Sequence, residues 1–286
     1  MTDQADGMAR VRKFDASRPN VARIYDYLLG GKDHFAADRQ AAQQLMTALP
    51  EAAAIARANR TFLAAAVRHV AQAGIAQYLD IGAGLPTSPS VHECARAVIP
   101  GARVAYVDSD VVAVTHAQAL LATGDGVVAA AGDAREPEAI LADPAVAAVI
   151  DLAEPVCVLL VSMLHFFTAA EADMIVGVLR QRMVPGSYLI ISQGHASRAP
   201  REGVKEAYGS GVTLTGRPAA EIAAYFDGFD LVPPGLVPVR DWPAAQPSGR
   251  PDQWPSPHQQ QQPQPVPAQP VPPQGGMLAG VGRKRA

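Results

Sequence analysis

Apolar residues in the middle of the chain fall into short continuous runs, separated by longer stretches with helical spacing. Each run predicts a strand, and each stretch between two runs predicts a helix. Strands that alternate with helices are typical of an α/β fold with a mostly parallel sheet and helices on both faces. The expected strands are residues 78–81, 103–108, 126–133, 155–161, 187–192, 229–239 (interrupted by prolines) and 277–284; the expected helices between them are 89–98, 111–121, 168–182 and 218–226.

Both flanks of this pattern differ from the centre. Apolar positions at helical spacing before the first strand predict helices over residues 19–29, 38–48 and 52–73, so we expect residues 18–74 to form a helical cap. Residues 1–17 are polar and are expected to be disordered. The α/β domain should cover residues 75–243 and finish with residues 276–286. Residues 244–275 are rich in proline and glutamine, which predicts a disordered insert before the last strand.

The connection after the first cap helix combines turn residues with polar and aromatic side chains. Gly30 ends the helix, and Asp33 and His34 follow after two intervening residues. We expect this segment to be a lid over a ligand, with Tyr25, Asp33 and His34 facing the ligand. A solvated link between two helices is the alternative.

Composition narrows the class of protein. The chain has 286 residues, 49% of them hydrophobic, which supports a large core. A formal net charge of −3 gives no reason to expect nucleic-acid binding. We find neither a signal peptide nor an apolar run of membrane-spanning length, so we expect a cytoplasmic protein that does not enter a membrane. The two cysteines, Cys94 and Cys157, predict packing positions and not a metal site.

A glycine turn follows the first strand of the α/β pattern. Gly82 and Gly84 allow close approach of a ligand, and Asp80 places a carboxylate at the end of the strand. Ser88 and Pro89 are expected to cap the helix that follows. The third glycine of a dinucleotide fingerprint is absent, because Thr87 stands there. A tight turn without a ligand is the alternative.

Two further strands end in acidic residues. Asp108 closes the second strand, beside Ser109, and its carboxylate suits a ribose diol. Asp133 closes the third, where it can receive an adenine amino group while the amide of Ala134 meets a ring nitrogen. Together with the glycine turn, this pattern predicts a site for S-adenosylmethionine. Arg135 is expected to be a local salt-bridge partner, and Asp110 is expected to cap the helix that follows the second strand.

The fourth strand leads into Ser162 and His165 at the edge of the sheet where ligands of open α/β folds bind. His165 is the candidate catalytic residue, because an imidazole can take a proton near neutral pH. The alternative is a histidine that only shapes the pocket. Gln193 and His195 end the fifth strand and are weaker candidates, and residues 196–211 are expected to form a flexible loop on the acceptor side.

Several segments resemble the S-adenosyl methyltransferase family of high-GC bacteria, formerly a domain of unknown function within the class I superfamily. The most specific are the run Leu-Asp-Ile-Gly-Ala-Gly-Leu-Pro-Thr at residues 79–87 and the N-terminal block at residues 18–35. Shorter matches occur at residues 59–60, 92–93, 106–110, 164–166 and 280–284. The resemblance implies a Rossmann-like fold of seven strands, with Asp80, Gly82 and Gly84 under the methionine end of the cofactor. It also implies that Asp108 holds the ribose and Asp133 the adenine.

We therefore expect methyl transfer from S-adenosylmethionine to a small-molecule acceptor, with no metal ion. Thr87, Ser109 and Ser162 are expected to complete the cofactor site. Two alternatives remain open at this point. One is a regulatory protein that binds the cofactor without turnover, and the other is a nicotinamide-dependent oxidoreductase.

Overall fold

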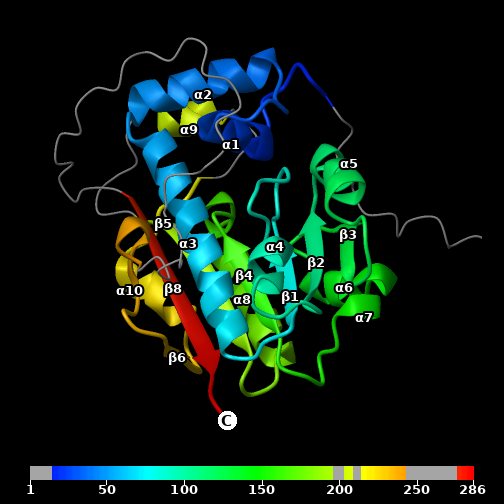
Figure 1. The fold of residues 1–286 in the computed structure, drawn as a ribbon. Coiled ribbons are helices and arrows are strands. Elements are labelled where there is room, and N and C mark those ends of the chain that lie inside the picture. The colour runs from blue at the N-terminus through cyan, green and yellow to red at the C-terminus, as the bar shows by residue number, and fades with distance from the viewer. Residues whose placement is uncertain (1–14, 196–202, 209–213, 243–275) are drawn as a thin grey trace, which may run out of the picture.

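A single twisted sheet with an antiparallel edge forms the centre of the molecule (Figure 1). The computed structural model describes residues 15–195, 203–208, 214–242 and 276–286. The strand order is β3-β2-β1-β4-β5-β8-β6, and β7 also pairs with β8. The first five strands run parallel, whereas β8 is antiparallel to β5. The strands are β1 (Gln77–Ile81), β2 (Arg103–Asp108), β3 (Val127–Ala131), β4 (Cys157–Val161), β5 (Tyr188–His195), β6 (Phe229–Leu231), β7 (Val237–Pro238) and β8 (Gly276–Lys284).

The mixed α/β architecture confirms the expected fold class, but the strand count is eight and not seven. The segment expected to be one interrupted strand forms two short strands, β6 and β7, which pair with different parts of β8. Pro233 and Pro234 lie between them and have no N–H to donate, and Gly235 has φ +92°. The ladder therefore breaks at these residues and resumes at Val237.

Helices cover both faces of the sheet. One face packs against α3 (Ala52–Gln72), α4 (Val91–Arg96) and α5 (Val111–Leu120), and the other against α6 (Pro137–Ala142), α7 (Pro144–Val149), α8 (Ala169–Arg182) and α10 (Ala219–Ala224). Every residue of β1 and of β4 is buried, as a strand covered on both sides requires. Tyr78 points into one apolar cluster and Leu79 into the other.

The N-terminal helices form a cap with its own apolar cluster. The cap consists of α1 (Val21–Leu29), α2 (Ala36–Ala48), the start of α3 and the short α9 (Val204–Ala207), gathered at one end of the sheet in Figure 1. Gly30 ends α1 in the left-handed conformation, as its position predicts. Residues 203–208 belong to the stretch expected to be a flexible loop, but they contain α9, whose Ala207 packs into the cap cluster. The rest of that stretch, the expected insert at 244–275 and residues 1–14 lie outside the described residues.

Of the predicted helix N-caps, the one for α4 is wrong and the one for α5 is confirmed. Ser88 and Pro89 do not cap α4; Ser90 does, with its Oγ accepting from the amide of Glu93 while the Glu93 carboxylate accepts from the amide of Ser90 at 2.6 Å. A serine followed three residues later by a glutamate satisfies two orphan amides at once, which Ser88 cannot do. Asp110 caps α5, as expected. Among the described residues, no helix is both long and apolar enough to cross a membrane.

A buried glutamine fastens the amino-terminal edge of the sheet. Gln77 starts β1, and its Nε2 donates to the carbonyls of Asp151 and Glu154 at 2.7 and 3.1 Å. Its Oε1 accepts from the amide of Asp151 at 2.8 Å. The side chain thereby satisfies the backbone of the turn that leads into β4.

We expect Gln77→Leu to lower the free energy of unfolding by about 2–4 kcal/mol, because several buried backbone groups lose their partners. Urea denaturation of both proteins measures the difference. Gln44→Leu on the exposed side of α2 is the matched control and should change stability by less than about 0.5 kcal/mol. Equal stability of the Gln77 variant and the wild type would contradict this role.

Candidate functional site

Acidic side chains mark the carboxyl ends of three neighbouring strands. Asp80 lies in β1 beside Tyr106 of β2, and Asp108 ends β2 beside Ala131 of β3. Asp133 follows two residues after β3 ends. Because β1, β2 and β3 are parallel and adjacent, the three carboxylates lie along one edge of the sheet. This is the edge at which open α/β sheets bind their ligands.

The glycine turn after β1 folds back over β2. The amides of Gly82 and Ala83 donate to the carbonyl of Val107 at 2.8 and 3.2 Å, and the amide of Gly84 donates to Asp108 Oδ2 at 2.8 Å. Both glycines have positive φ, +75° and +66°. A Cβ at Gly82 would lie 3.2 Å from the Cβ of Met163. The turn therefore requires glycine for its conformation, and at Gly82 also for its close approach to Met163.

Arg60 of α3 fixes the far side of this turn. Its Nη2 donates to the carbonyls of Thr87 and Pro89 at 3.2 and 2.9 Å. The Thr87 hydroxyl donates to the carbonyl of Leu85. Asn59, the residue before Arg60, is buried, and its Nδ2 donates to Tyr25 Oη at 3.0 Å.

Asp80 is a buried carboxyl group with an altered acidity. It is 6% exposed, and burial raises its pKa to about 7, with nearby Arg60 opposing this rise and Asp108 adding to it. At neutral pH a large fraction of the group is therefore protonated. A cation placed against it would favour the charged form.

Asp108 is held in one orientation by backbone amides. Its Oδ1 accepts from the amide of Asp110 at 2.8 Å and its Oδ2 from that of Gly84. The backbone of Ser109 also favours the ionised form of this carboxylate. Burial raises the pKa of Asp108, and these amides oppose the rise. A carboxylate has about four acceptor positions, so the group can still accept from the two hydroxyls of a ribose.

Asp133 forms an ion pair and several hydrogen bonds with Arg135. Its Oδ2 lies 2.6 Å from Arg135 Nη2, and its Oδ1 accepts from the amide of Arg135 at 2.9 Å. This pair confirms Arg135 as a local salt-bridge partner. Ala134 is buried in the apolar cluster that lies against α6 and α7. The adenine end of the expected site is therefore built with fewer open acceptor positions than the ribose end.

The lid residues make their contacts mainly within the cap. Tyr25 Oη donates to the carbonyl of Ala56 at 3.1 Å, and His34 Nδ1 lies 3.0 Å from Asp26 Oδ2. Asp33 Oδ2 lies 3.7 Å from the Nδ1 of His116 on α5. The cap nevertheless reaches the glycine turn, because the methyl group of Ala22 lies 3.9 Å from a Cβ built at Gly84.

A buried ion pair connects the cap to the ribose end, and sequence reasoning missed it. Arg23 Nε lies 2.8 Å from Asp38 Oδ2, and Arg23 Nη1 lies 3.8 Å from Asp110 Oδ2. The amide of Asp110 in turn donates to Asp108. Arg23 is 3% exposed although it is charged. Its position on the helix, between Val21 and Ile24, is also typical of a solvent-exposed arginine. The local sequence therefore gives no indication that Arg23 is buried.

The expected acceptor side lies where β4 ends. Ser162 has φ 58°, and its amide donates to Ser192 Oγ at 2.9 Å. A 3₁₀ turn (Leu164–Phe166) follows, in which His165 is 9% exposed and packs against the Phe166 ring at 4.3 Å between centroids. His165 Nδ1 is buried without a hydrogen-bond partner among the described residues.

The acidity of His165 changes what this side chain can do. Burial and the positive charge of Arg217 lower its pKa to about 4. The imidazole is therefore neutral at pH 7, and it is a hydrogen-bonding group more than a strong base. Gln193 and His195, expected at the end of the fifth strand, lie within β5 and pair with β8. The side-chain Nε2 of Gln193 donates to the carbonyl of Thr215 at 3.2 Å.

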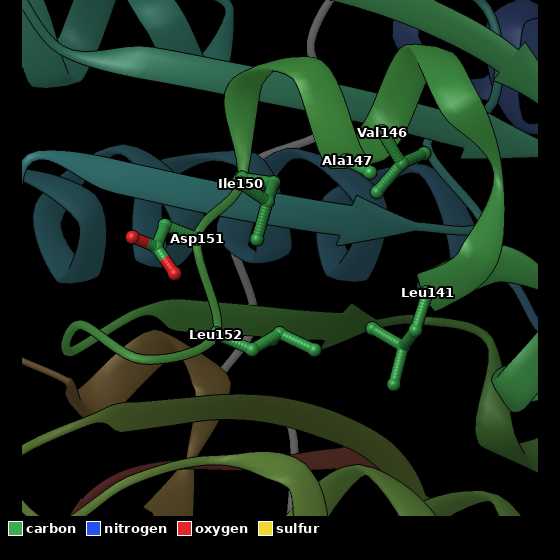
Figure 2. A pocket seen from close by; sticks show the side chains of 6 residues that line it. All are labelled: Leu141, Val146, Ala147, Ile150, Asp151 and Leu152. Carbon is green, nitrogen blue, oxygen red and sulfur yellow. The ribbon is translucent and has the colours of Figure 1, made fainter.

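A hollow of about 360 Å³ lies away from these groups (Figure 2). Most of the residues that line it have apolar side chains, among them Leu141, Ile150 and Leu152. Asp151, which also lines it, bonds to Gln77 at the amino-terminal edge of β1. The hollow is thus separated from the carboxylates by the length of a strand and has no part in the candidate site.

Sheet order, glycine turn and acidic strand ends together define the class I, S-adenosylmethionine-dependent methyltransferase fold. The chain belongs to the S-adenosyl methyltransferase family, whose sequence profile matches residues 8–285. It is a methyltransferase that uses S-adenosylmethionine. The donor set fits this cofactor, because a buried carboxyl group suits an ammonium and a fixed carboxylate suits a diol.

Two crystal structures resemble the chain over nearly its whole length. A candidate methyltransferase from Thermobifida fusca YX has 38% identity and a TM-score of 0.80, with 95% of this chain and 97% of that chain covered. A DUF574 family protein from Streptomyces avermitilis MA-4680 has 35% identity and a TM-score of 0.80, with 94% and 99% covered. No curated protein matches the chain.

We expect the affinity for S-adenosylhomocysteine to fall roughly fivefold to tenfold between pH 7.5 and pH 6. Binding its ammonium requires ionised Asp80, and a group with a pKa of about 7 is mostly protonated at pH 6. Calorimetry at a series of pH values measures this. Asp80→Asn should bind more weakly at pH 7.5 and lose the dependence. An affinity that stays constant in the wild type would contradict the assignment.

Proposed function

We propose that this methyltransferase acts on a small molecule, held between the cap and the Leu164–Phe166 turn. One observation carries the proposal: the cap closes over the carboxyl edge of the sheet from two sides. Ala22 of α1 lies over Gly84, and the Tyr208 ring meets the Phe166 ring edge-on at 5.4 Å between centroids. A site enclosed in this way suits a compact acceptor better than a polymer.

In this proposal the residues at the strand ends divide the cofactor among them. Asp80 takes the ammonium, the backbone of Gly82 and Gly84 lies under the methionine end, and Asp108 takes the ribose hydroxyls. The remaining contributors flank these groups or cover them: Ser109, Thr87 and Ser162 beside the chain, Asp133 and Ala134 at the adenine, and Tyr25, Asp33 and His34 in the cap. The bound cofactor supplies a methyl group on a sulfonium, which is reactive without a metal ion.

The protein then has to place the acceptor atom in line with the methyl group and exclude water. In this proposal His165 hydrogen-bonds the acceptor. A hydroxyl oxygen becomes strongly acidic as its bond to the methyl carbon forms and the sulfur–carbon bond breaks. Even an imidazole whose pKa is lowered to about 4 can take that proton late in the reaction. His165 would therefore act after attack has begun, not before.

Asp108→Ala should weaken the binding of S-adenosylhomocysteine at least tenfold, because hydrogen bonds to a charged acceptor contribute about 1.5–3 kcal/mol each. Isothermal titration calorimetry provides the measurement. Asp125→Ala, in an exposed turn, is the matched control and should bind like the wild type. Undiminished binding in the Asp108 variant would reject the ribose assignment.

The acceptor class is tested by incubating the protein with methyl-labelled S-adenosylmethionine and an extract of the host cells. Label in the metabolite fraction supports a small-molecule acceptor. Label in protein or nucleic acid contradicts it and redirects the substrate class. His165→Gln should retain cofactor binding and transfer label at least tenfold more slowly. The two alternatives raised by the sequence, a regulator without turnover and a nicotinamide-dependent enzyme, gain no support from any feature of the site.

A further inference from the structure

A buried arginine lies directly behind the acceptor-side turn. Arg217 is 1% exposed and precedes α10, far from the turn in sequence. Within the described part of the chain, no carboxylate forms an ion pair with it. Burying a charge is costly unless hydrogen bonds compensate it, so such a residue must be held by specific partners.

Those partners are the backbone groups that flank His165. Arg217 Nη1 donates to the carbonyl of Leu164 at 3.2 Å, and Nη2 to that of Phe167 at 3.4 Å. The guanidinium thus spans the 3₁₀ turn from one side to the other. Its planar fork can do this with two separate nitrogens, which a lysine cannot.

The segment that carries Arg217 adds backbone bonds to the same region. The amide of Thr215 donates to the carbonyl of His165 at 2.7 Å, and the amide of Arg217 donates to that of Gly194 at 3.0 Å. Gly194 faces the imidazole, because a Cβ built there would lie 3.6 Å from the His165 Cβ. Gly194 of β5 therefore packs against the turn, and Thr215 and Arg217 hydrogen-bond to its backbone.

We propose that Arg217 is the positioning residue for His165: it spans the turn and sets which edge of the imidazole faces the acceptor. The part of this inference that concerns methyl transfer rests on the function proposed above. The charge of Arg217 also contributes, because it helps to keep the imidazole neutral. The aromatic ring of Tyr225, 5.8 Å from the guanidinium carbon, packs on its other side.

Nitrogen NMR of ¹⁵N-histidine-labelled protein tests the positioning directly and needs no acceptor. In Arg217→Met the His165 ring signals should shift, and the imidazole should titrate at least about one pH unit higher, because a nearby positive charge is lost. Arg217→Lys keeps the charge but not the fork, so its ring signals should shift while the titration stays low. Arg180→Met is the matched control, since Arg180 also donates to a carbonyl, that of Asp227, but on the surface.

Label transfer and cofactor binding complete the test. Both Arg217 variants should transfer label at least tenfold more slowly and bind S-adenosylhomocysteine within threefold of the wild type. Unmoved His165 signals in either folded variant would overturn the proposal, whatever the transfer rate. Wild-type transfer by His165→Gln would instead refute the catalytic role of His165, and the NMR result would still decide whether Arg217 positions it. If Arg217→Met does not fold, the lysine variant alone carries the decision.

Discussion

Two buried carboxyl groups, those of Asp80 and Asp108, lie on neighbouring strands at the carboxyl edge of the parallel sheet. The residues around them have to compensate for the cost of burying them. Burial raises the pKa of both Asp80 and Asp108, and the charge of Asp108 raises the pKa of Asp80 further. Burying two such groups is unfavourable unless hydrogen bonds or opposite charges provide compensation. Backbone amides supply it to Asp108, and the guanidinium of Arg60 supplies part of it to Asp80. The pKa of Asp80 is nevertheless raised, and an ammonium ligand beside it would lower that pKa.

The cap belongs to the same electrostatic arrangement. Arg23 lies between Asp38 of the cap and Asp110, whose amide holds Asp108. The cap helix α1, the N-cap residue of α5 and the carboxylate of Asp108 are thus connected through ion pairs and a hydrogen bond. On the acceptor side a second buried arginine, Arg217, acts on the backbone. In both places an arginine that is nearly inaccessible to solvent holds together the elements at the carboxyl edge of the sheet.

Local chemistry explains how much the sequence could predict. The glycine turn, the acidic strand ends and the N-cap of α5 depend on neighbouring residues, and their positions could be predicted. The start of α4 was misplaced by two residues, because Ser88 and Ser90 both look like caps until Glu93 is paired with one of them. The acidity of His165 and the role of Arg217 depend on residues about 50 positions apart in the chain. No periodicity or motif reports such contacts, so only the folded structure shows them.

The carboxyl ¹³C signal of Asp80, followed by NMR against pH with and without S-adenosylhomocysteine, tests the central claim most directly. Without ligand the group should titrate near pH 7, because it is buried. With ligand bound it should stay ionised down to about pH 5 or below, because the ammonium neutralises it. A titration that the ligand leaves unchanged would contradict the account of this site.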